Sequence, residues 1–160
     1  MNTTKISLGT VQFGIDYGIN STSGQVKSGE VVDILNYAQQ CGINLLDTAP
    51  SYGNSEHVLG TSNIQNFKIV TKTRHFSQAK ISDKDVTLLI NDLNQSFQLL
   101  KKKSVYGVLV HNASDLFKPG ADKIIRQLEL LKRQGLISKI GVSVYNYDQF
   151  FIKLFIILTP

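Results

Sequence analysis

Short apolar runs alternate with longer amphipathic segments along this chain, and that alternation restricts its fold more than any other feature. Several of the apolar runs are hydrophobic at consecutive positions, so neither face of such a strand can be left in water. Strands covered on both faces are typical of parallel sheets whose connections are helices. The pattern therefore predicts an α/β fold of repeated strand and helix units. The predicted strands span 5–12, 43–47, 68–72, 106–111 and 139–144.

The segments between these runs have helical periodicity. Ser28 is placed to cap a first helix that Gly42 closes. Ser82 and Asp85 resemble a capping box at the start of a longer helix, and another helix is predicted over 122–134. The inward-facing positions that we predict are Val31, Ile34, Leu35 and Ala38 in the first helix, Val86, Leu89, Ile90, Leu93, Phe97 and Leu100 in the second, and Ile125, Leu128 and Leu131 in the third.

Five such units fit two architectures. One is an open, doubly wound sheet, and the other is most of a barrel; periodicity does not distinguish them. The chain has 160 residues, which is the size of a single domain. We therefore expect one domain over residues 1–160.

Composition narrows the classes of partner. The chain has 17 basic and 12 acidic residues, and the resulting net charge of +5 favours anions without naming one. The basic run at 101–103 lacks interleaved aromatic residues, so we interpret it as a solvated helix end and expect no nucleic-acid partner. The apolar segment 149–160 is too short to span a membrane and contains Lys153. The expected location is the cytoplasm, with no membrane partner.

Four residues with reactive or ionisable side chains are predicted to have no catalytic role. The single cysteine, Cys41, excludes an intramolecular disulfide framework and is interpreted as a packed residue. His57 and His75 have no companions at metal-ligand spacing, so we expect them in surface or loop positions and expect no metal site. Glu56 is interpreted as a residue that favours the start of a short helix.

Ionisable residues end three successive apolar strands: Asp47, Lys72 and His111. The carboxyl ends of parallel strands meet at one edge of a sheet, where ligands and catalytic residues collect. A buried lysine is costly without a carboxylate, and Asp47 is the neighbour that could pair with Lys72. We therefore expect these three side chains to lie together.

Tyr52 follows Asp47 by five residues, in a loop that could return its phenol over the strand ends. A nearby ammonium stabilises a phenolate, and a phenol tuned in this way can donate a proton to a developing alkoxide. The hypothesis is that Asp47 holds Lys72, Lys72 tunes Tyr52, and His111 offers a hydrogen bond to the substrate oxygen.

Four motifs with this spacing resemble the aldo-keto reductase family, from about Leu8 to Asp148. The resemblance implies a TIM (β/α)8 barrel and reversible hydride transfer between NADPH, or NADH, and the aldehyde or ketone of a small molecule. It assigns Tyr52 as the general acid. The motifs are LDTA with YG over 46–53, VTKT over 70–73, VHN over 110–112 and IGVS over 140–143.

The same resemblance assigns supporting roles to the other residues. Asp47 and Lys72 match the charged supports of the acid, and His111 matches the group that orients the carbonyl. Asn112 would line the substrate pocket, and Ser143 would contact the nicotinamide amide. The family commonly has asparagine directly after that serine, where this chain has valine.

A complete barrel needs about 250 residues, so the resemblance covers about five β/α units of an incomplete barrel. We therefore expect a truncated aldo-keto reductase-like domain in which most of the cofactor site is absent and which could be inactive alone. An alternative is a noncatalytic half-barrel that self-associates through its open edge. A third interpretation, an unrelated α/β phosphate-binding domain, leaves the four strand-end residues unexplained.

Overall fold

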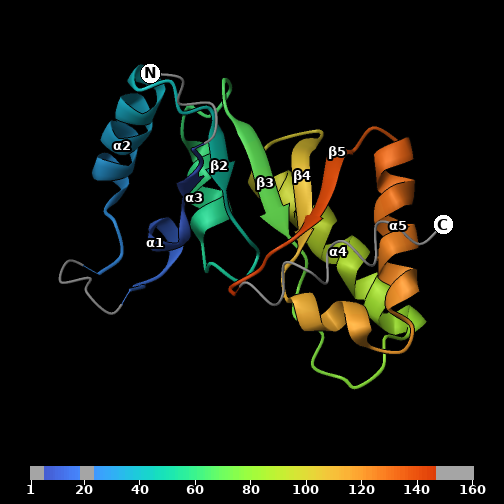
Figure 1. Cartoon of the computed structure of the whole chain (residues 1–160). Coiled ribbons are helices and arrows are strands. Elements are labelled where there is room, and N and C mark those ends of the chain that lie inside the picture. The colour runs from blue at the N-terminus through green and yellow to red at the C-terminus, as the bar shows by residue number, and fades with distance from the viewer. Residues whose placement is uncertain (1–5, 19–23, 147–160) are drawn as a thin grey trace.

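The structure, a computed structural model, describes residues 6–18 and 24–146. In this part of the chain five parallel strands form one sheet, and their spatial order is their order in the sequence (Figure 1). Parallel neighbours need a crossover connection, and each crossover here contains helical structure. The strands are β1 (Leu8–Gly9), β2 (Leu45–Asp47), β3 (Lys68–Lys72), β4 (Val105–Val110) and β5 (Ile137–Val142).

The helices lie along one face of this sheet and around its two sides, with α2 beside β1 and β2 and α5 beside β5 (Figure 1). The longest, α4, begins with a full capping box: Ser82 accepts from the Asp85 amide, and the Asp85 carboxylate accepts from the Ser82 amide. No helix of the described residues is both long enough and apolar enough to cross a bilayer. The helices are α1 (Val11–Gly14), α2 (Ser28–Gln40), α3 (Ser55–Thr61), α4 (Asp83–Leu99) and α5 (Ala121–Arg133), with a 3-10 helix, η1, at Ala113–Phe117.

The predicted elements are confirmed in kind, and several boundaries differ. The first strand is two residues long, because the chain turns after Gly9 into α1 and thereby buries Phe13. The α2 helix begins at Ser28 itself, so Ser28 is not its cap; Lys27 holds that position without a side-chain hydrogen bond. The apolar stripe of α5 runs through Ile124 in place of Ile125, with Leu128 and Leu131 as predicted.

Strand register divides the sheet into two chemically different faces. Leu46 and Ile69 are paired across β2 and β3, and both are buried under the helices. Their neighbours in sequence, Asp47 and Val70, are also paired but point the opposite way, because successive side chains alternate in a strand. We call the first surface the helix-covered face and the second the open face.

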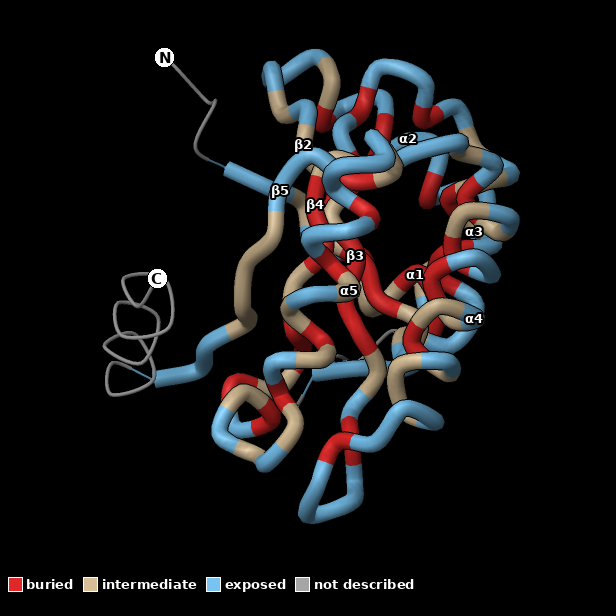
Figure 2. The backbone as a smooth tube through the Cα atoms, turned by 90° about the vertical axis from the view of Figure 1, so that its right-hand side faces the viewer, coloured by how far each residue is buried: buried red, intermediate tan, exposed pale blue. Residues whose placement is uncertain are grey.

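Most of the hydrophobic core lies on the helix-covered face. Figure 2 shows the buried positions along the central strands and on the sides of the helices that face them. Two core residues, Val105 and Ile137, are paired near the start of β4 and β5 and belong to the open face by strand alternation. The buried members of the core are Phe13, Val31, Leu35, Ala38, Leu46, Leu59, Ile64, Phe67, Ile69, Phe76, Ile81, Leu89, Leu93, Leu100, Val105, Val108, Val110, Ile124, Leu128, Leu131 and Ile137.

Candidate active site

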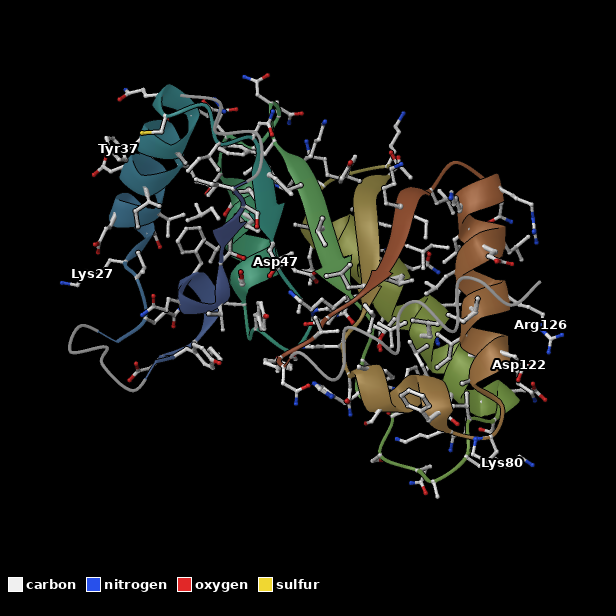
Figure 3. The ribbon with its side chains drawn as sticks, in the orientation of Figure 1. Lys27, Tyr37, Asp47, Lys80, Asp122 and Arg126 are labelled. Carbon is white, nitrogen blue, oxygen red and sulfur yellow. The ribbon has the colours of Figure 1, made fainter. Side chains whose placement is uncertain are left out.

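The three strand-end residues meet at the carboxyl edge of the sheet. Asp47 ends β2 (Figure 3), Lys72 ends β3, and His111 directly follows β4. The Lys72 Nζ donates to both Asp47 carboxylate oxygens, at 2.8 and 2.7 Å, and to the Thr48 carbonyl oxygen at 3.0 Å. The Lys72 ammonium is almost fully buried, so these three acceptors replace its lost hydration. The lysine is thereby held in a single position.

Tyr52 returns over this ion pair, as the motif spacing predicts. The Lys72 Nζ lies 4.8 Å from the centroid of the Tyr52 ring, and the Tyr52 ring meets the His111 ring edge to face, with centroids 6.0 Å apart. The structure therefore brings Asp47, Lys72, Tyr52 and His111 into one cluster. An ammonium at this distance stabilises negative charge that develops on the phenol.

A set of buried hydroxyls fixes the turn that carries Tyr52. The Ser55 Oγ donates to the carbonyl oxygen of Thr10 at 2.8 Å and lies 3.2 Å from the Thr48 Oγ1. The Thr10 Oγ1 in turn donates to the Asp47 carbonyl oxygen at 3.0 Å. All three hydroxyl-bearing residues are fully buried. The turn is thus tied to the ends of β1 and β2.

Two glycines let the same turn pack closely on α1. A Cβ on Gly14 would lie 1.7 Å from the Tyr52 carbonyl oxygen, so no other residue fits there without movement of the backbone. Gly53 has a φ of +58°, a backbone conformation that favours glycine, and a Cβ at this position would also clash with the Gly14 carbonyl oxygen. The backbone of Tyr52 is therefore held from both sides.

His111 is buried, and its ring is electrically neutral at ordinary pH. The pKa of His111 is lowered to about 4. Burial is the largest cause, and electrostatic repulsion from the nearby His75 and Lys72 lowers the pKa further. Its amide donates to the Thr73 Oγ1, which fixes the backbone, while its Nδ1 has no hydrogen-bond partner among the described residues. A neutral imidazole retains one N–H, which can be offered to a carbonyl oxygen.

The structure places Asn112 and Ser143 at the same edge, but neither joins the cluster of four by a hydrogen bond within the described residues. The Asn112 side-chain oxygen caps η1 by accepting from the Ser114 amide at 3.1 Å and its hydroxyl at 2.9 Å. Ser143 follows β5, and its amide donates to the Val110 carbonyl oxygen at 2.9 Å. The Ser143 side chain is half-buried.

Glu56 lies in the first turn of α3, as expected, and its side chain is also buried, at 3% exposure. Its carboxylate accepts from the Thr71 hydroxyl at 2.7 Å and from the Ser96 hydroxyl at 2.9 Å, on the helix-covered face. Burial raises its pKa above the ordinary value.

His75 was expected in a surface or loop position, and the structure confirms an exposed loop residue but adds a contact. Its ring lies against the ring of His111, with centroids 4.3 Å apart and planes inclined by 37°. Nothing in the local sequence pattern predicts this contact, because the two residues belong to different loops.

Comparison with known proteins supports the family assignment. A sequence model of the aldo/keto reductase family matches residues 5–150. The D-arabinose 1-dehydrogenase of Saccharomyces cerevisiae is 29% identical over 125 residues, which is 72% of this chain and 37% of the yeast protein.

Solved structures agree on the fold. A Pseudomonas aeruginosa protein assigned to the aldo-keto reductases superposes with a TM-score of 0.74 and 32% identity, over 92% of this chain and 58% of that protein. A Klebsiella pneumoniae aldo/keto reductase in complex with NADP and acetate has a TM-score of 0.63 at 19% identity, over 91% of this chain and 47% of that one. The expected fold, about five β/α units of a TIM barrel, is thereby confirmed. The chain spans less than two thirds of the length of each of these proteins.

Proposed function

The chain belongs to the aldo/keto reductase family, and we propose that its carboxyl-edge site reduces the carbonyl group of a small aldehyde or ketone with NADPH or NADH. One observation carries the proposal: the Lys72 ammonium is bound to Asp47 and lies 4.8 Å from the Tyr52 ring centroid. This arrangement places a fixed positive charge beside a phenol that is half-exposed at the edge of the site.

Each of the four residues has a defined part in the reduction. The neutral His111 ring donates its N–H to the carbonyl oxygen and so orients the substrate. Tyr52 transfers its phenolic proton to that oxygen as it becomes an alkoxide, and an alcohol is formed. Lys72 stabilises the phenolate left behind, and Asp47 keeps the ammonium charged and in place.

Ser143 fits the nicotinamide end of the cofactor. It lies at the same edge of the sheet, its backbone is fixed by the bond to Val110, and its hydroxyl makes no hydrogen bond to another described residue. The hydroxyl would hold the carboxamide of the nicotinamide, and Asn112 would line the adjacent substrate pocket. When bound, the reduced cofactor supplies the hydride that the carbonyl carbon accepts. The Klebsiella structure, which contains NADP, supports this choice of cofactor.

The name of the yeast relative indicates a substrate class. A dehydrogenase that acts at carbon 1 of D-arabinose acts on a hydroxylated aldehyde or its cyclic form. We extend to this chain only the broader class, a small carbonyl compound.

The substitution Tyr52→Phe tests the proton transfer. We expect carbonyl-dependent oxidation of NADPH to fall by about 10²- to 10⁴-fold, because the general acid is removed. The change in NADPH fluorescence on binding should persist, since the phenyl ring remains. Tyr37→Phe is the control, because Tyr37 points outward from α2 at 69% exposure (Figure 3). Equal turnover by wild type and Tyr52→Phe would contradict the role of Tyr52.

A second candidate is the noncatalytic half-barrel that self-associates through its open edge, and apolar residues on the open face of the sheet favour such association. Leu45, Val70 and Leu109 lie on that face and are only half-buried. Light scattering across a range of protein concentrations tests it. Association that is lost in Leu109→Lys would support this candidate, and a monomer at every concentration would count against it.

A further inference from the structure

The loop after β3 places the His75 ring against the ring of His111. The two imidazole rings are 4.3 Å apart at their centroids, and the outer ring, His75, is exposed while His111 is buried. His75 is therefore the ring of this pair that solvent and ligands can reach directly. The ring nitrogens of His75 make no hydrogen bond to any other described residue, so they are available to a ligand.

A buried carboxylate holds this loop in place. Asp115, fully buried in η1, accepts from the amide of Phe76 at 3.3 Å, and the Phe76 ring is itself in the core. Lys118 pairs with the same carboxylate at 2.6 Å and donates to the Phe76 carbonyl oxygen. The residue directly after His75 is thus fixed through both of its backbone polar groups. His75 is an exposed side chain on an anchored backbone, which is a property that suits a binding group.

The charges near His75 are already paired. Lys72 is bound to Asp47, Lys118 to Asp115, and the Arg74 Nε lies 3.0 Å from an Asp92 carboxylate oxygen. A ligand at His75 therefore meets a hydrogen-bonding imidazole, with no unpaired cation among these three side chains. An oxygen atom that accepts a hydrogen bond is the matching group.

We propose that His75 is a substrate-positioning residue that binds an oxygen atom on the carbon next to the carbonyl, while His111 binds the carbonyl oxygen. This inference rests on the proposed function and names its preferred substrates: small carbonyl compounds with a neighbouring hydroxyl or carboxylate group. Oxygens on adjacent carbons of one substrate lie close together, and the rings of His75 and His111 are also close, so each ring can bind one of the two oxygens. The oxygen can belong to a hydroxyl or a carboxylate, and the probes below separate these sources.

Nuclear magnetic resonance of the histidine rings tests the contact directly. The sequence has three histidines, so His57→Gln and His75→Gln assign their signals, and His57, exposed on α3, is the internal control. The protein is saturated with NADP⁺, which cannot reduce a carbonyl, and titrated with hydroxyacetone, butanone or pyruvate. NADPH absorbance is followed during the titration, because NADP⁺ can accept a hydride from the alcohol of hydroxyacetone. Hydroxyacetone and butanone differ by a hydroxyl in place of a methyl group.

We expect hydroxyacetone to shift the signals of both His75 and His111, and butanone to shift that of His111 alone. A shift at His75 with pyruvate but not with hydroxyacetone would assign the subsite to carboxylates. Shifts at His111 without any change at His75 would overturn the inference and leave the proposed function standing. If neither ring responds to any probe, the proposed function itself fails.

Steady-state kinetics provides the second measurement. His75→Phe keeps an aromatic ring against His111 but removes the hydrogen bond, so the KM for hydroxyacetone should rise about tenfold, the equivalent of about 1.4 kcal/mol. The kcat for hydroxyacetone and both constants for butanone should be unchanged. Equal effects on the two ketones would mean that His75 only supports His111 and would overturn the inference.

Discussion

Thr71 and Lys72 are adjacent in β3, yet each faces a different carboxylate in a different environment. Thr71 donates to Glu56 beneath the helices, whereas Lys72 is bound to Asp47 on the open face. The Glu56 carboxyl is enclosed by protein, while the Asp47 side chain is 29% exposed. The helix-covered face uses its carboxylate to join α3, β3 and α4. The open face uses its carboxylate to set the position of a charge beside a phenol.

The difference shows how one strand serves stability and chemistry together. Successive side chains of β3 point to opposite faces of the sheet, so a polar residue of β3 on the open face does not enter the core under the helices. Stability therefore depends mainly on one set of positions and the proposed activity on the other. This separation can be tested by substitutions at neighbouring residues.

The largest expected effect distinguishes Ile69 from Val70. Ile69→Ala creates a cavity under the helices and should lower the free energy of unfolding by about 2–5 kcal/mol. Val70→Ala, on the open face, should cost about 1 kcal/mol or less, because Val70 is only half-buried. Urea unfolding followed by circular dichroism measures both. Similar losses for the two variants would show that the open face contributes as much packing as the helix-covered one.

The second effect concerns the buried carboxyl group of the helix-covered face. Glu56→Ala leaves the Thr71 and Ser96 hydroxyls without their acceptor, and we expect a loss of about 1–3 kcal/mol in unfolding free energy. Glu129→Ala, at an exposed position of α5, is the matched control and should have almost no effect. A loss no larger than that of the control would show that the hydrogen bonds of Glu56 do not stabilise the packing of the helices.

Glu56 also predicts a pH dependence. Its pKa is raised by burial, so the folded protein retains a proton that the unfolded chain has already lost. Its contribution to stability is therefore present at low pH and is lost as the pH rises from about 4.5 through the raised pKa. Glu56→Gln should lack that loss, which urea titrations at several pH values would reveal.

The open face has the opposite pH dependence. The pKa of His111 is lowered to about 4, so between that value and about 6.5 the unfolded chain binds a proton that the folded protein does not. Unfolding free energy should fall as the pH drops through this range, by at most about 1.4 kcal/mol per pH unit. His111→Phe should remove this slope and His57→Gln should retain it. A wild-type slope that survives in His111→Phe would assign it to another group.

Sequence reasoning succeeded where one local pattern determines the outcome. The Lys68–Lys72 strand was predicted with its observed bounds, and the Ser82–Asp85 capping box is present, because each depends on residues close in the chain. The grouping of Asp47, Lys72 and His111 was also predictable, since parallel strands bring their carboxyl ends to one edge. Tyr52 could be placed with them because its loop is short.

The contacts that escaped prediction join loops or faces whose relative placement is tertiary. The local sequence predicts Glu56 only as a polar residue at a helix start. Its buried carboxylate accepts a hydrogen bond from Ser96, which is 40 positions away in α4. The contact between His75 and His111 likewise depends on how Asp115 holds the loop after β3. Local patterns do not encode such distances. The roles of Asn112 and Ser143 stay predictions that ligand binding must test.

The order of the strands also bears on how the protein is made. Because the sheet runs β1-β2-β3-β4-β5, each strand pairs with the one synthesised just before it. As the chain leaves the ribosome, a new β/α unit finds its neighbour already present and need not wait for a distant segment. Short sequence separation between partners also favours rapid pairing. Translation itself thus presents the strands in the order in which the sheet can grow.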